Sequence, residues 1–127
     1  MKIIDKIFTL QNRSPFNTLR HSELVLTANI TKVKKYSKGT TIIYKDSPIQ
    51  NLFIIEKGEA SYKNSPISSF FGAEELLNDV VLEENVVAQT DIEALVISKG
   101  HFYTLIYECP GLMIEIIKYY EDNRIAK

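Results

Sequence analysis

The chain has 127 residues, of which 45% are hydrophobic and 24% are charged. This balance is typical of one folded domain and argues against disordered or collagen-like architectures. The net charge of −1 conceals a segregation of charge along the chain. Residues 1–63 carry eleven Lys or Arg and five acids, whereas residues 64–98 carry seven acids and no Lys or Arg. Residues 99–127 carry four basic and four acidic residues. A pI near 6.1 also argues against a uniformly basic nucleic-acid-binding protein.

The remaining composition indicates a reducing, cytoplasmic setting. Cys109 is the single cysteine, so the chain cannot form an internal disulfide. The residues after Met1 lack the apolar run of a signal peptide, and no stretch approaches the roughly 20 apolar residues that cross a bilayer. We expect a cytoplasmic domain that does not insert into a membrane.

Two helices are predicted before the first strand. The spacing of Ile3, Ile4, Ile7 and Phe8 predicts a short amphipathic helix over residues 3–12. A second helix is expected at about residues 21–31, with Ser22 as its N-cap. Its buried residues are expected to be Leu24, Leu26, Ala28 and Ile30.

From Thr31 onward the sequence changes to short runs of β-branched and aromatic residues separated by Gly, Pro and polar turns. This pattern predicts a mainly β protein with flanking α-helices, built as a β-roll or double-stranded jelly roll. The six predicted strands are 33–36, 40–44, 52–56, 59–63, 86–90 and 92–98.

Helix-forming residues return at 73–78, and again after Gly100. We expect one helix from His101 to Cys109 and another that begins at Pro110 and runs to about Asp122. The apolar residues of the last helix extend too far around it for a single packing face, and this pattern has two interpretations. The helix docks on the β-roll alone, or it docks there and also contacts a second copy or a partner domain. The residues assigned to that partner contact are Leu112, Met113, Ile116, Ile117 and Tyr120.

Four fragments, in this order and spacing, resemble the cyclic nucleotide-binding domain family. They are a strand–Gly–x–x–Ile unit at 36–43, an aliphatic–aromatic pair with a Gly turn at 52–60, Phe71-Gly72, and a closing strand and helix start at 94–102. The family includes the sensor modules of catabolite-activator-type regulators, nucleotide-gated channels and kinase regulatory subunits. The resemblance implies one domain over 1–127, with N-terminal helices at 1–31, a β-roll at 32–98 that holds a phosphate-binding cassette at 71–88, and C-terminal helices at 99–127.

The cassette departs from the family pattern at its charged positions. Threading without gaps places Ala73 where the family has the Glu that binds the ribose, and Leu82 where it has the Arg that pairs with the phosphate. Glu83 and Glu84 fall on two small residues, and a shift by one residue would let Glu74 serve as the ribose acid. The ligand pocket implied by the resemblance consists of Phe71, Gly72, Ala73, Glu74, Leu76, Leu82, Glu83, Val86 and Val87.

The missing arginine has an energetic consequence. A charged hydrogen bond to phosphate contributes about 1.5 to 3 kcal/mol, and residues 64–98 contain neither Lys nor Arg. Leu82 removes that attraction, and Glu83 beside it adds repulsion. We therefore expect a regulatory or sensor domain in which the binding of cAMP or cGMP is lost or altered.

Three alternatives stay open. In the first alternative the pocket is vestigial and the domain serves only protein interaction or dimerisation. In the second the domain senses another small molecule that is neutral or cationic. In the third alternative it is a genuine cyclic nucleotide binder with a non-standard basic residue, such as Lys45, Lys57 or Lys63.

Enzyme activity is not expected. His21 and His101 lie far apart in the sequence and match no metal-binding spacing, and Cys109 has no partner at a spacing suited to nucleophilic catalysis. No catalytic residue, metal or required cofactor is predicted; a ligand would be a cyclic nucleotide or another small molecule. The chain stops near Lys127, before the helix-turn-helix that follows this module in bacterial activators, so we expect no direct DNA binding.

Overall fold

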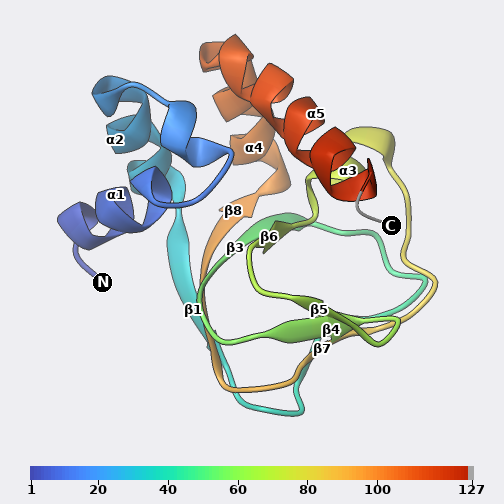
Figure 1. Ribbon diagram of the computed structural model, residues 1–127. Coiled ribbons are helices and arrows are strands. Elements are labelled where there is room, and N and C mark those ends of the chain that lie inside the picture. The colour runs from blue at the N-terminus through green and yellow to red at the C-terminus, as the bar shows by residue number, and fades with distance from the viewer. Residues whose placement is uncertain (126–127) are drawn as a thin grey trace. The chain divides into compact units, whose positions relative to one another are not determined.

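The structure is a computed structural model and describes residues 1–125 (Figure 1). The chain divides into two compact units. One is the continuous segment Thr31–Lys99, and the other combines Met1–Ile30 with the segment that begins at Gly100.

The unit Thr31–Lys99 contains two four-stranded antiparallel sheets, with strand orders β1-β8-β3-β6 and β2-β7-β4-β5 (Figure 1). The prediction of a β-roll with helices before and after it in the chain is confirmed. The strands are β1 (Lys32–Tyr36), β2 (Thr41–Ile43), β3 (Asn51–Lys57), β4 (Ala60–Tyr62), β5 (Ser65–Ile67), β6 (Phe70–Phe71), β7 (Val86–Ala88) and β8 (Ile92–Ser98).

The longest pairing joins β3 to β8 from Asn51↔Ser98 to Lys57↔Glu93. Successive side chains of a strand point to opposite faces, yet residues 52–55 and 94–97 are all buried. Burial on both faces explains why these strands read as continuous apolar runs instead of alternating ones. The pair is the centre of its sheet, with β1 on one side and β6 on the other.

Two strands were not predicted. Pro66 suggested a turn, but it lies within β5, the last strand of its sheet, where a residue without a backbone N–H is tolerated. The bend itself falls earlier, at Lys63 and Asn64, whose φ angles of 51° and 65° fit a two-residue hairpin turn. The other unpredicted strand, β6, has only two residues and carries no periodic signal.

The second unit is helical. Helix α1 contacts both α2 and the short 3₁₀ helix η1, and α5 also contacts η1. The remaining helix, α3 (Ala73–Asn78), belongs to the β unit. No helix within residues 1–125 is both long enough and apolar enough to cross a membrane. The bounds are α1 (Ile3–Gln11), η1 (Phe16–Thr18), α2 (His21–Ile30), α4 (Lys99–Glu108) and α5 (Pro110–Ile125).

The apolar stripe predicted for α1 is not the face that is buried. Ile4 and Phe8 are 69% and 65% exposed, whereas Thr9 and Leu10 are buried. Thr9 tolerates burial because its hydroxyl donates a 3.0 Å hydrogen bond to the Asp5 carbonyl. The hydrogen-bonded threonine thus belongs to the packed side of the helix.

The second helix differs in a similar way. Helix α2 already begins at His21, and the carboxylate of Glu23 accepts a 2.9 Å hydrogen bond from the backbone N–H of Arg20, so Ser22 is not the N-cap. Leu26, which was predicted to be buried, is 36% exposed, and Thr27, for which no prediction was made, is buried.

Gly58 provides a test of the close packing between its turn and the turn before β8. Its φ of 97° is left-handed, and an added Cβ would collide with the backbone oxygen of Asp91. Gly39 is also left-handed, at 89°, but a Cβ there would meet open space. We expect Gly39→Ala to cost about 1 kcal/mol and Gly58→Ala at least about 2 kcal/mol in the free energy of unfolding, measured by urea denaturation. Equal losses would contradict this packing.

Candidate functional site

The cassette begins where β6 ends. Phe71 is half-buried and its ring stacks on that of Phe53 in β3, with centroids 4.8 Å apart and planes at 7°. The Phe53 ring in turn lies 6.4 Å from that of Tyr36 in β1. These aromatic contacts fix the point at which the chain leaves the sheet.

Gly72 makes the turn into α3. Its φ is 105°, and an added Cβ would lie 2.9 Å from the backbone oxygen of Asn51. Both the left-handed backbone and the close approach therefore require glycine at this position.

Helix α3 presents acids in its first turn. Ala73, at the threaded position of the ribose-binding acid, is fully buried, and Leu76 is 1% exposed. Glu74 and Glu75 are half-buried. Burial raises the pKa of Glu75; a backbone hydrogen bond within its own residue opposes this shift, and the neighbouring carboxylate of Glu74 adds to it.

The end of α3 is tied to the start of α4. Asp79, the C-cap residue, has a left-handed φ of 52°, and its Oδ1 lies 2.8 Å from Nζ of Lys99. Lys99 is the last residue of the β unit and the first residue of α4. The cassette and the origin of the C-terminal helices are thus joined by one ion pair.

The second half of the cassette lies against the loop between β2 and β3. Leu82 is only 7% exposed, and its carbonyl accepts a 2.9 Å hydrogen bond from the backbone N–H of Asp46. The side-chain oxygen of Asn85 accepts a 2.7 Å bond from the backbone N–H of Lys45, and Val81 forms a bridge to Pro48. Leu82 is therefore a packed residue and not one that points into solvent.

Glu83 contacts the end of β4 and the turn that follows it. Its Oε2 lies 2.7 Å from Nζ of Lys63, and its backbone N–H donates a 3.2 Å hydrogen bond to the hydroxyl of Tyr62. Sequence reasoning named Lys63 among three lysines but missed Tyr62. No local motif marks Tyr62, because its partner is a backbone group on a distant segment.

The last predicted pocket residues, Val86 and Val87, lie in β7. Val86 is 1% exposed and pairs with Ile43, and Val87 is half-buried and pairs with both Thr41 and Ser61. The predicted site therefore consists of two stretches: Phe71–Leu76, at the β6–α3 junction, and 82–87, which runs along the β2–β3 loop into β7.

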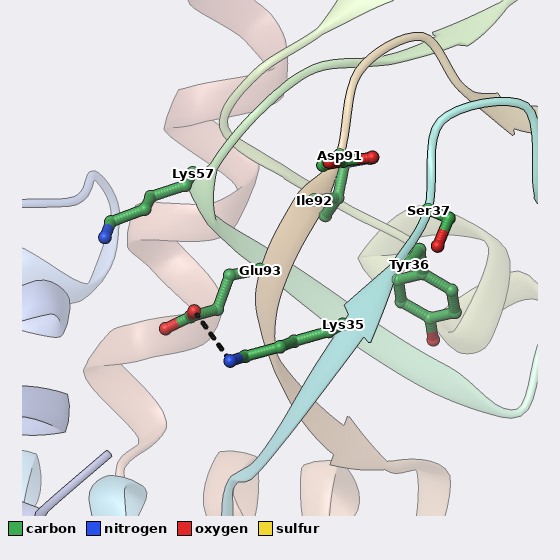
Figure 2. A pocket seen from close by; sticks show the side chains of 7 residues that line it. All are labelled: Lys35, Tyr36, Ser37, Lys57, Asp91, Ile92 and Glu93. Carbon is green, nitrogen blue, oxygen red and sulfur yellow. Dashed lines mark ion pairs between the residues drawn. The ribbon is translucent and has the colours of Figure 1, made fainter.

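Two cavities lie elsewhere in the β unit. One, of about 350 Å³, is lined by seven residues, among them Lys57, Tyr36 and Ser37 (Figure 2). There Nζ of Lys35 lies 3.9 Å from Oε2 of Glu93 (Figure 2). The other, of about 210 Å³, is lined by residues from 42–53. Neither cavity is lined by a cassette residue.

The last helix carries apolar side chains in two environments. Leu112 and Ile116 are buried, Met113 and Tyr120 are half-buried, and Ile117 is 50% exposed. Ile114, three residues before Ile117 and on the same side of the helix, is 56% exposed. The predicted partner set therefore includes both buried and accessible residues.

The ionisable residues outside the cassette form no metal centre. Within residues 1–125 no group of three or more His, Cys, Asp or Glu side chains is arranged to hold a metal ion. Cys109 is buried, and burial raises the pKa of its thiol to about 11. A thiol that stays protonated at neutral pH is a poor nucleophile.

The chain belongs to the cyclic nucleotide-binding domain family, whose model matches residues 33–109. It is 31% identical over 105 residues to a cAMP-dependent protein kinase regulatory subunit of Colletotrichum orbiculare, an alignment that covers 76% of this chain and 27% of the relative. The corresponding subunit of Hypocrea atroviridis is 26% identical, with 87% and 24% covered. The chain thus spans about a quarter of the length of these curated relatives.

Solved structures share the fold. The regulatory domain of Toxoplasma gondii protein kinase A, crystallised with cAMP, has a TM-score of 0.75 at 17% identity, covering 93% of this chain and 50% of that one. A regulatory subunit of a cAMP-independent protein kinase A from Trypanosoma cruzi, bound to guanosine, scores 0.77 at 22% identity, with 94% and 46% covered. A triple variant of the Trypanosoma brucei subunit, bound to cAMP, scores 0.76 at 20% identity, with 95% and 51% covered.

The shifted pKa of Glu75 has a measurable consequence. Because the folded state raises this pKa, ionisation of Glu75 opposes folding, and its cost appears as the pH rises through that pKa. Glu75→Gln should therefore raise the free energy of unfolding at pH 7, by less than about 1 kcal/mol because the side chain is partly exposed. The gain should vanish below about pH 4, where the carboxyl is protonated in both states.

Thermal unfolding at the two pH values measures this difference. Glu84→Gln, which removes an exposed acid of the same segment, is the matched control. A gain for Glu75→Gln that is equal at both pH values, or no larger than the gain of the control, would contradict the assignment.

Proposed function

We propose that this chain is a non-enzymatic regulatory domain of signal transduction in which the binding of cAMP or cGMP is lost or altered. The proposal is carried by Leu82: the residue at the threaded arginine position is an apolar side chain that is only 7% exposed. Glu83 follows it as an exposed acid, and residues 64–98 offer no Lys or Arg as a substitute. A cyclic phosphate would therefore meet repulsion where relatives supply a charged hydrogen bond.

The signal would pass through the ion pair between Asp79 and Lys99. A ligand or partner that contacts residues 71–87 would shift the end of α3, and Asp79 would transmit this shift to Lys99, where α4 begins. The C-terminal helices would then move between two arrangements whose populations depend on occupancy of the cassette.

The variant structure from Trypanosoma brucei supports the role given to Leu82. One of its three substitutions introduces an arginine, and the three positions have the same spacing as Glu75, Leu82 and Glu83 in this chain. That variant is bound to cAMP, whereas its parent belongs to a cAMP-independent kinase. We infer that these three positions decide whether this chain accepts a cyclic phosphate.

Three alternatives each rest on an observation. The bond between Tyr62 and Glu83 favours a vestigial pocket that the chain fills itself, which would leave a protein-interaction or dimerisation module. The guanosine-bound subunit favours a sensor for an uncharged ligand. Lys63, which contacts the cassette, favours a cyclic nucleotide binder with a non-standard basic residue.

The partner contact is proposed for α5. Ile114 and Ile117 form an exposed apolar pair on one side of this helix, suited to a second copy of the chain or a partner domain. We place the domain in the cytoplasm and assign it no contact with DNA.

The role of Leu82 is tested by calorimetric titration with cAMP and cGMP. We expect no micromolar binding by the native chain and a gain of about tenfold to a hundredfold in affinity for Leu82→Arg, the range that a charged hydrogen bond supplies. Leu82→Met is the control that keeps an apolar side chain. Because arginine is costly at a buried position, Glu75→Ala/Leu82→Arg/Glu83→Ala provides a second test with less acid nearby. Micromolar binding by the native chain would refute the proposal.

The partner contact is tested by sedimentation at several concentrations. We expect the apparent mass to rise with concentration for the native chain, and Ile114→Ser/Ile117→Ser to remain monomeric over the same range. Tyr107→Ser, which removes an 84% exposed side chain from α4, should behave like the native chain. A native chain that is strictly monomeric at every concentration would exclude self-association through α5.

A further inference from the structure

The β4–β5 hairpin forms a compact cluster with the cassette. Lys63 is in the turn, with φ 51°, and Tyr62 is the last residue of β4. Nζ of Lys63 lies 5.5 Å from the centre of the Tyr62 ring and 2.7 Å from Oε2 of Glu83. The Tyr62 hydroxyl accepts the backbone N–H of Glu83, so the ammonium of Lys63 and the hydroxyl of Tyr62 both contact this residue.

The cluster supplies groups that bind anions. An ammonium is a donor typical of phosphate sites, and a tyrosine hydroxyl that accepts one hydrogen bond still has its own proton to donate. The anion now beside the ammonium is the chain's own carboxylate. The bond between the two groups lowers the pKa of Glu83 and raises that of Lys63, so both are charged at neutral pH.

The carboxylate is held weakly. The side chains of Lys63 and Glu83 are 48% and 79% exposed, and solvent screens such pairs strongly. Displacing Glu83 therefore costs little, and the displaced carboxylate moves into water without losing a buried contact. The Glu83 carboxylate can therefore occupy the position beside the Lys63 ammonium and still be displaced by another anion.

We propose that Lys63 and the Tyr62 hydroxyl form a masked binding site for a phosphate group, and that the Glu83 carboxylate is the internal anion that occupies it. This inference rests on the proposed function, because it explains how a cassette without an arginine stays unoccupied. It adds that Lys63, outside the cassette, supplies a usable cation that Glu83 neutralises.

The test removes the carboxylate and keeps its shape. Glu83→Gln should bind cAMP at least about tenfold more tightly than the native chain, as measured by calorimetry at low ionic strength, and the gain should shrink as salt is added. Adenosine, which lacks the phosphate, should show no gain. Adding Lys63→Gln to Glu83→Gln should return the affinity to the native value. Glu84→Gln is the matched control, because it removes an adjacent exposed acid that makes no 2.7 Å bond to Lys63.

The outcomes separate the two proposals. A Glu83→Gln variant that binds cAMP no better than Glu84→Gln, or a gain that survives Lys63→Gln, overturns the masked site and leaves the role of Leu82 intact. Micromolar binding of cAMP by the native chain overturns the proposed function itself. All three substituted residues, Lys63, Glu83 and Glu84, are exposed, and thermal unfolding of each variant verifies that it is folded.

Discussion

The antiparallel pairing of β3 with β8 is the contact on which the β unit depends. It joins two seven-residue strands whose central residues are buried on both faces, so neither strand is stable without the other. β6 pairs with β3 and leads through Gly72 into the cassette, and β8 leads directly into α4. The start of the cassette and the last strand before α4 are therefore both held by this one strand pair.

Two ion pairs connect the cassette to the rest of the β unit. Asp79 pairs with Lys99, and Glu83 pairs with Lys63, so two acids of the Lys- and Arg-free stretch are neutralised by lysines that flank it in the sequence. The charge segregation thus has a structural counterpart. In the family pattern the cassette contains an arginine that pairs with the phosphate of the ligand. In this chain the cassette instead contains Asp79 and Glu83, which pair with lysines outside it.

Sequence reasoning recovered what depends on local composition. The apolar runs of β3 and β8 and the bend at Gly72 follow from residue type. Features that depend on distant partners were missed. Pro66 hid β5 because its tolerance comes from an edge position. The contact of Tyr62 with a backbone N–H leaves no trace in the sequence at all.

The position of Pro66 also bears on solubility. β5 is the last strand of its sheet, and an edge strand ordinarily offers a row of backbone donors and acceptors to any passing chain. Proline has no N–H to offer, and β5 is only three residues long. A fifth strand, from another molecule, would find too few backbone partners to extend the sheet. The residue that obscured this strand in the sequence thus protects this edge of the sheet from pairing with another chain.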